Sequence, residues 1–122
     1  MANENLKQRT KLFALRIIKM VEHLPESKTS RTLGNQVLRS GTSVAANYRA
    51  GCFAKSKRDF INKLKTVEEE ADETIFWLEL IEESGIFSSN KLLSIKTEAH
   101  EILAIIIASI KTARKNQKKP NQ

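Results

Sequence analysis

The sequence predicts an all-α fold, an antiparallel up-down-up-down four-helix bundle, and three observations lead to it. Apolar residues recur every three or four positions in four segments, each about 20 residues long. None of these segments alternates apolar and polar residues, which is the pattern of a half-buried strand. The 122 residues include four glycines and two prolines, and so few helix-breaking residues favour long helices joined by short turns. Short turns join antiparallel neighbours in bundles.

The first helix is expected over residues 3–24. Pro25 ends it, because proline disfavours helical conformation in the residue before it. Leu12, Leu15 and Ile18 widen its apolar surface beyond a single stripe. The stripe itself consists of Leu6, Phe13, Ile17, Met20, Val21 and Leu24.

The second helix is expected from an N-cap at Thr29 or Ser30 to about Gly51, which we interpret as its C-terminal stop. It is rich in small residues and is the predicted packing centre. Gly41 inside a helix costs about 1 kcal/mol relative to alanine, so we expect a neighbouring helix to approach its backbone closely. Its buried face consists of Leu33, Val37, Gly41, Val44 and Tyr48.

The third and fourth helices follow short polar turns. Ser56, with Asp59 three residues later, predicts the third N-cap, and Ser84-Gly85 predicts the stop. Ser89 is the expected N-cap of the fourth helix. We expect one domain over residues 1–115 and a basic, disordered tail over 116–122. The two apolar stripes consist of Phe60, Leu64, Val67, Ala71, Ile75, Leu78 and Ile81, and of Leu92, Ala99, Ile102, Leu103, Ile106, Ile110 and Ala113.

Charge is segregated along the chain. The net charge is +7 and the isoelectric point about 9.7, which admits a polyanion partner. Residues 28–65 carry nine basic residues and one acid, whereas residues 66–83 carry eight acids and no base. Arg39 beside the small-residue face fits a partly buried ion pair as well as a phosphate contact. The predicted nucleic-acid-binding residues are Arg31, Arg39, Arg49, Lys55, Lys57, Arg58, Lys111, Arg114 and Lys115.

Surplus apolar residues predict a homo-oligomer, because one bundle core needs about one stripe per helix. The run from Ile102 to Ile110 is too short to span a bilayer. The N-terminal residues lack the layout of a signal peptide, and a single cysteine, Cys52, fits a reducing compartment. We therefore expect a cytoplasmic protein with no membrane partner. The predicted interface residues are Leu12, Leu15, Ile18, Phe76, Trp77, Leu80, Ile105 and Ile107.

The sequence does not predict an enzyme. It has no glycine-rich phosphate loop, no nucleophile–base pair and no zinc spacing, so we expect no small-molecule substrate, metal or other cofactor. Bundle iron sites use Glu-x-x-His, but Met20 and Thr97 stand three residues before the two histidines. We interpret the acids from Glu68 to Glu73 as a solvated face or one facing a basic helix.

Three other residues have a structural and a chemical interpretation. Cys52 is interpreted as a packed residue rather than a reactive thiol. Asp59 is interpreted as a helix N-terminal residue rather than an acid or base. Trp77 could stack on a nucleic-acid base, although a core edge or a subunit interface is the favoured interpretation.

A recognisable pattern is formed by Gln36-Val37-Leu38-Arg39-Ser40, Ser43-Val44-Ala45-Ala46-Asn47, Gly51, Ser56-Lys57-Arg58-Asp59-Phe60 and Leu78-Glu79-Leu80. On these residues the chain resembles the bacterial four-helix-bundle family, also called the 23S rRNA intervening-sequence protein family, over residues 12–110. It departs from the family pattern at 48–50 and is more acidic over 67–73.

The resemblance implies a ring-like homo-oligomer, often a pentamer. It also implies that some relatives act with RNA or DNA, one branch as the basic accessory partner of a reverse transcriptase in diversity-generating retroelements. Two hypotheses follow for this chain. It is either a nucleic-acid-binding accessory protein that holds phosphates without reading sequence, or a self-assembling interaction scaffold with no nucleic-acid role.

Overall fold

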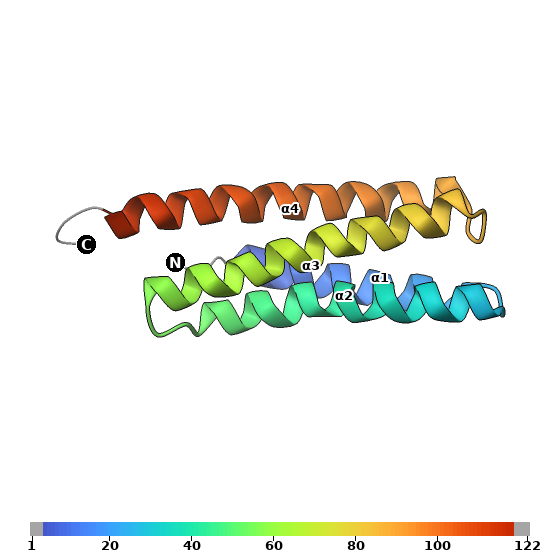
Figure 1. Cartoon of the computed structure of the whole chain (residues 1–122), viewed down its shortest axis with the longest axis horizontal. Coiled ribbons are helices and arrows are strands. Elements are labelled where there is room, and N and C mark those ends of the chain that lie inside the picture. The colour runs from blue at the N-terminus through green and yellow to red at the C-terminus, as the bar shows by residue number, and fades with distance from the viewer. Residues whose placement is uncertain (1–3, 119–122) are drawn as a thin grey trace.

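The computed structural model describes residues 4–118 and contains four helices within that range, with no strand (Figure 1). They are α1 (Glu4–Glu22), α2 (Lys28–Cys52), α3 (Lys57–Glu83) and α4 (Ser89–Lys118). Successive helices run in opposite directions along one long axis. The predicted all-α, up-down-up-down bundle is therefore confirmed.

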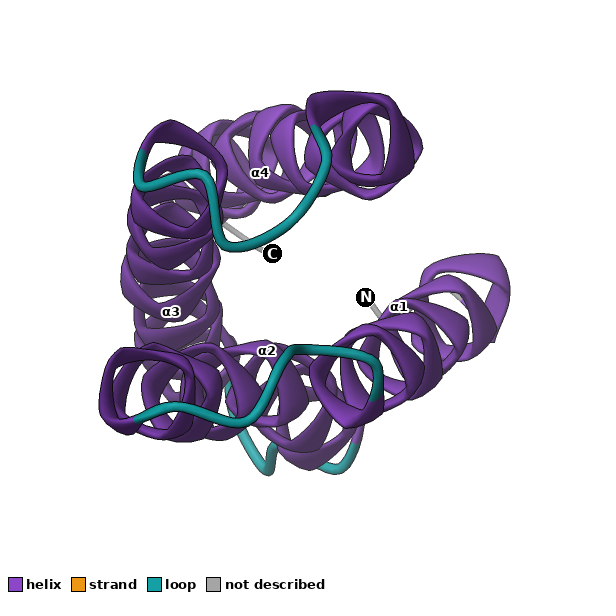
Figure 2. Cartoon of the chain, turned by 90° about the vertical axis from the view of Figure 1, so that its right-hand side faces the viewer, coloured by secondary structure: helices purple, strands orange, loops and turns teal. Residues whose placement is uncertain are grey.

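Each helix packs mainly against its neighbours in the chain. The contacts between α2 and α3 are the most extensive, and those between α1 and α4 are much the sparsest. Viewed down the bundle, the helices form an open C whose gap lies between α1 and α4 (Figure 2). Within the described residues no Cα atom of α1 lies within 8 Å of one in α3, and the two helices are not adjacent around the bundle.

The core consists of the inward stripes of all four helices. Every residue of the predicted α3 stripe is buried, as are Ile17 of α1, Val37 and Tyr48 of α2 and Ile106 of α4. Four residues predicted on the stripes lie at the core edge and are half-buried: Val21, Leu24, Leu33 and Leu103. The 3.6-residue period therefore identified most of the core, but it missed Ile61 and Ile95, which are also buried.

Gly41 is the point of closest approach between α1 and α2. A Cβ atom at Gly41 would lie 2.9 Å from Cγ1 of Ile17, which is buried completely. The predicted close approach is confirmed, and the neighbouring helix is α1. Gly51 has a similar packing role, because a Cβ there would lie 3.3 Å from Cβ of Lys63. The helix ends at Cys52, one residue beyond the predicted end at about Gly51, and Gly51 itself is helical rather than a C-terminal cap.

The N-caps of two helices differ from the predicted ones. Ser27, not Thr29 or Ser30, caps α2: its backbone is extended and its hydroxyl accepts the Ser30 N–H at 3.0 Å. Ser89 is the first residue of α4, and the backbone carbonyl of the preceding Ser88 accepts the N–H groups of Lys91 and Leu92. The predicted cap at Ser56 is confirmed, since its hydroxyl accepts the Asp59 N–H at 3.0 Å. Serine is a good cap wherever its backbone is extended, so clustered hydroxyl residues do not identify the cap by themselves.

The boundaries of the first and last helices differ slightly from the predicted ones. Helix α1 starts at Glu4 and ends at Glu22, and the predicted start at Asn3 lies outside the described residues. Helix α4 continues through 116–118, which were predicted to belong to the tail, and 119–122 lie outside the described residues. No described helix is both long and apolar enough to cross a membrane.

Candidate nucleic-acid interface

The predicted nucleic-acid-binding residues gather at one end of the bundle, with two exceptions. This end contains the start of α1, the turn between α2 and α3, and the last turns of α4 (Figure 1). All its predicted cations are exposed except Lys57, which is half-buried. We call this set the basic end: Arg49, Lys55, Lys57, Arg58, Lys111, Arg114 and Lys115.

Antiparallel topology brings these distant segments together. Lys7 and Lys11 of α1 line a hollow of about 480 Å³ with Arg49 of α2, so the first helix adds cations that were not in the predicted set. Asp59 is the one acid between residues 45 and 65, and there is none between 102 and 118. None of the basic-end residues forms an ion pair with a described carboxylate.

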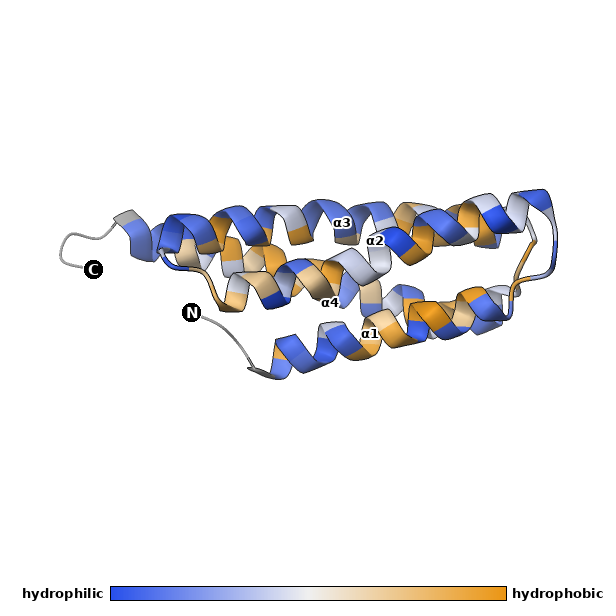
Figure 3. Cartoon of the chain, turned by 90° about the horizontal axis from the view of Figure 1, so that it is seen from below, coloured by the Kyte–Doolittle hydropathy of each residue, from blue (hydrophilic) through white to orange (hydrophobic). Residues whose placement is uncertain are grey.

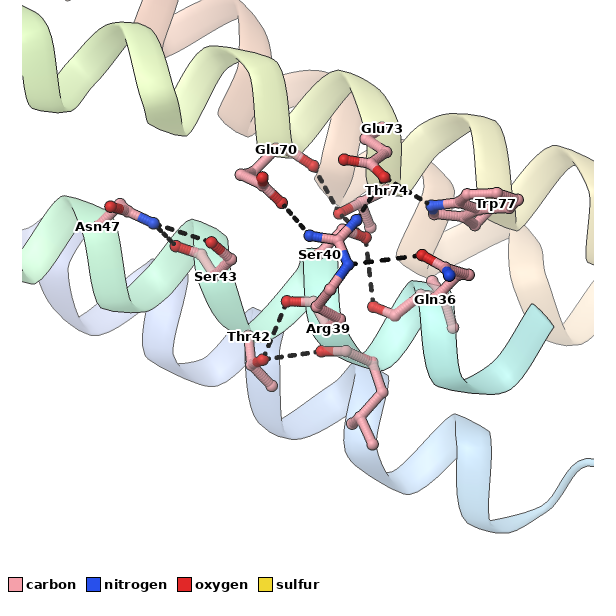
Figure 4. A network of polar contacts seen from close by, with 12 residues as sticks. Gln36, Arg39, Ser40, Thr42, Ser43, Asn47, Glu70, Glu73, Thr74 and Trp77 are labelled. Atoms are coloured by element: carbon pink, nitrogen blue, oxygen red, sulfur yellow. Dashed lines mark hydrogen bonds and ion pairs between the residues drawn. The ribbon is translucent and has the colours of Figure 1, made fainter. Parts of the chain in front are cut away.

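Arg31 and Arg39 lie away from the basic end. Arg31 lines a hollow beside the α1–α2 turn, at the opposite end of the bundle. Arg39 lies halfway along α2, where its Nη1 donates to Glu70 Oε2 at 3.1 Å and its Nη2 donates to the Glu73 carboxylate (Figure 4). Of the two interpretations open for Arg39, the structure shows the ion pair, and it forms within one chain.

Polar groups around Arg39 link α2 to α3. Trp77 donates its indole N–H to Glu73 Oε1 at 3.3 Å, so the same carboxylate binds an arginine and a tryptophan. Beneath them, the buried hydroxyls of Ser40 and Thr74 share a hydrogen bond of 2.8 Å (Figure 4). This network links α2 to α3. It holds Trp77 at the edge of the core, where its side chain is half-buried.

Three other acids of α3 have no cation partner in the described chain. Glu68, Glu69 and Asp72 form no ion pair with a described residue. They line a groove against α4. Between residues 4 and 118, no group of histidine, cysteine and carboxylate side chains is arranged to hold a metal ion.

Phe53 is a candidate site residue that sequence reasoning missed. It follows α2 directly, in the turn of the basic end, and is 69% exposed. Lys7 Nζ lies 5.3 Å from the centre of its ring. A lone aromatic residue in a short basic turn, outside every helical stripe, was the signal that could have identified it. Exposed rings among cations are the usual platform for nucleic-acid bases.

The predicted interface residues divide into exposed and half-buried groups. Leu12, Leu15, Ile18, Phe76 and Ile107 are exposed, by 37% to 52%, whereas Trp77, Leu80 and Ile105 are half-buried. The first turns of α1 are mostly hydrophilic, and hydrophobic residues gather in its middle and second half (Figure 3). Leu93, at 65% exposure, is a further exposed apolar residue that was not predicted.

Ion pairs join α4 to both of its neighbours. Arg9 of α1 binds Glu98 and Glu101, and Lys96 binds Glu82 of α3. The Arg9 guanidinium holds the pKa of Glu98 below its usual value, and the two carboxylates raise the pKa of Arg9 further above its already high value. Hydrogen bonds from Lys96 and then Ser89 lower the pKa of Glu82 in the same way.

A known protein family matches this chain over most of the bundle. Residues 3–108 match the family described as 23S rRNA-intervening sequence protein. The chain belongs to this family. The predicted resemblance is thus confirmed, and the match covers most of the bundle.

A solved structure supports the same family assignment. It is the crystal structure of a protein of unknown function from the S23 ribosomal protein family, from Bacteroides thetaiotaomicron. The two chains are 37% identical, with a TM-score of 0.82, and the alignment covers 87% of this chain and 98% of that one. No curated protein matches the chain.

Proposed function

We propose that this protein is a non-enzymatic accessory protein that binds the phosphate backbone of nucleic acid through its basic end, without reading base sequence. The observation that carries the proposal is the convergence of unpaired cations from three helices on one end of the bundle. Lysine and arginine that neutralise phosphates release counterions, which drives sequence-independent binding.

The distribution of acids supports the same proposal. Apart from Asp59, the acidic side chains of α3 and α4 lie in the middle of the bundle and towards the other end, where Arg39, Arg9 and Lys96 pair with some of them. The basic end lacks such partners, so its field remains available for an external polyanion. A plain solubilising surface would carry both signs of charge interspersed.

Phe53 extends the proposal to single strands. A base of an unpaired nucleotide can stack on this exposed ring while the neighbouring lysines and arginines contact its phosphates. A duplex has no unstacked base to offer. We therefore expect single-stranded RNA or DNA to bind more tightly than a duplex of the same length.

A salt titration with variants tests the proposal. Binding of a fluorescent single strand is measured by anisotropy, and we expect affinity to fall steeply as salt rises. Lys55→Gln/Arg58→Gln/Lys115→Gln should weaken binding and reduce the salt slope. The matched control, Lys28→Gln/Arg31→Gln/Lys91→Gln, removes as much charge from the opposite end and should bind as the wild type does. Equal losses in both variants, or no binding at low salt, would contradict the proposal.

Self-assembly is the second candidate function, and the exposed apolar residues favour it. Leu12, Leu15, Phe76 and Ile107 lie on three helices with no described neighbour covering them, and isolated chains seldom expose so many large apolar residues. We include self-association in the proposal. The five-fold ring remains a prediction, which light scattering on the native protein tests directly.

A further inference from the structure

An acidic groove with an apolar wall runs along the outside of α3 and α4. Its volume is about 410 Å³, and α4 contributes Leu103 and Ile107, of which Ile107 is 37% exposed. Helix α3 contributes Glu68, Glu69 and Asp72, with Lys65 at one end. The three carboxylates form no ion pair with any described residue. The groove therefore combines unbalanced negative charge with exposed hydrocarbon.

The outer face of α1 has the complementary chemistry. Lys11, Leu15 and Lys19 are spaced four residues apart, so they form one column on the helix surface. Leu12 and Ile18 flank this column, and all five residues are exposed. We call them the α1 ridge. Between residues 5 and 22, the one acid on the same face is Glu22, at the end of the helix.

The ridge and the groove of one chain cannot meet. Among the described residues, no Cα atom of α1 lies within 8 Å of one in α3, and Figure 2 shows α1 at one end of the open C and α3 along its back. Their opposite charges and shared apolar character nevertheless match. We propose that the α1 ridge of one copy docks into the acidic groove of a second copy of this chain, with leucines of the ridge against Leu103 and Ile107.

This contact joins two different surfaces, so it is heterologous rather than two-fold symmetric. Each copy offers a free groove after its ridge is bound, and association continues until the arrangement closes on itself. The inference rests on the self-association included in the proposed function and does not depend on nucleic-acid binding. It specifies which residues would form the interface and excludes ridge-to-ridge pairing.

Charge exchange tests the pairing. Molar mass is measured by light scattering, and helicity by circular dichroism shows that each variant is folded. Lys11→Glu/Lys19→Glu should shift the assembly to the single-chain mass of 13.8 kDa, and so should Glu69→Lys/Asp72→Lys. All four changes in one chain restore opposite charges and should restore the wild-type mass. The control reversal Glu26→Lys/Lys28→Glu lies outside both surfaces and should leave the mass unchanged.

A mixing experiment tests the direction of the contact. Leu15→Glu disables the ridge and Ile107→Glu disables the groove, and each variant alone should be a monomer. Mixed in equal amounts, they retain one intact ridge and one intact groove between them, so they should form a dimer and stop there. An isologous contact through either surface would give no such dimer.

Four results would overturn the proposal, and they separate it from the wider one. A wild-type chain of single-chain mass would remove self-association altogether. Three results would contradict this interface alone. They are retention of the assembly by either charge variant, failure of the variant with all four changes to assemble, and absence of the mixed dimer. Weaker binding of the single strand in the salt titration concerns only the basic end, because the residues changed there, Lys55, Arg58 and Lys115, belong to neither the ridge nor the groove.

Discussion

Arg9 and Glu98, separated by 89 positions in the chain, are joined by two hydrogen bonds of 2.7 Å each. Arg9 Nε donates to one carboxylate oxygen and Nη2 donates to the other, which is the bidentate geometry of a strong charge-assisted pair. Their side chains are 30% and 20% exposed. They lie where α1 and α4 otherwise make few contacts, so this pair is the main polar link across the open side of the bundle.

Removing the charge of Glu98 should loosen that side. For Glu98→Gln we expect the free energy of unfolding to fall by about 1–2 kcal/mol, since a bidentate charge-assisted bond is lost at a partly buried site. Urea denaturation measures the change. Glu101→Gln is the matched control: Glu101 accepts one bond and is 57% exposed, so its loss should be below about 0.5 kcal/mol. Equal effects would show that bidentate geometry adds nothing.

Stability should also depend on pH through Glu98 and Glu82. Both have a folded-state pKa below the reference value of 4.5. A depressed carboxyl pKa stabilises the fold above the unfolded-state value, and this contribution is lost as pH falls from about 4.5 through the folded-state pKa. Glu98→Gln should flatten the decline of the melting temperature in that acidic window. An unchanged decline would contradict the assigned role of Arg9.

Close packing at Gly41 predicts a large effect of a larger side chain. Gly41→Leu should destabilise the fold by about 3 kcal/mol, because Cβ alone would overlap Ile17 and the rest of the leucine has no space. Ala46→Leu, on the same helix but exposed, should change stability little. Thermal denaturation of both variants makes the comparison. Combining Gly41→Leu with Ile17→Ala should recover part of the loss, and its failure to do so would place the clash elsewhere.

The buried hydroxyls of Ser40 and Thr74 should act as a coupled pair. Thr74→Val removes their shared bond and leaves Ser40 with a weaker partner, the Val37 carbonyl at 3.4 Å. We expect a loss of about 1–2 kcal/mol from this single change. Adding Ser40→Ala should cost less than the sum of the two single changes, because the unsatisfied hydroxyl is then removed as well. Additive losses in a double-mutant cycle would show that the two groups are independent.

The helical pattern of the sequence was enough for the fold and for most of the core. Phe60, Leu64 and Leu78 were predicted inside and are buried, because a period of 3.6 residues specifies which face of α3 turns inward. Helix caps were less predictable. Ser27, Thr29 and Ser30 have similar hydroxyls, and only the extended backbone of Ser27 distinguishes the cap.

The candidate site was predictable in composition but not in location. Arg31 and Arg49 look equivalent in the sequence, yet they lie at opposite ends of the bundle. Arg9 was not predicted at all, because its partner Glu98 is near it only after the first and last helices pack together. Phe53 was missed because helical periodicity gives no information about turn residues. Pairing and exposure depend on tertiary geometry, which local patterns do not contain.

The order in which the helices pack has a consequence for folding kinetics. Each extensive contact joins helices adjacent in the chain, separated by short turns, so forming them requires little loop-closure entropy. Packing α1 against α4 closes the longest loop of the chain, because α2 and α3 lie between them, and it forms the fewest contacts. The α2–α3 hairpin is then expected to form early and the Arg9–Glu98 link late. A change at Glu98 accordingly speeds unfolding and leaves the folding rate nearly constant, whereas a change at the Ser40–Thr74 pair slows folding.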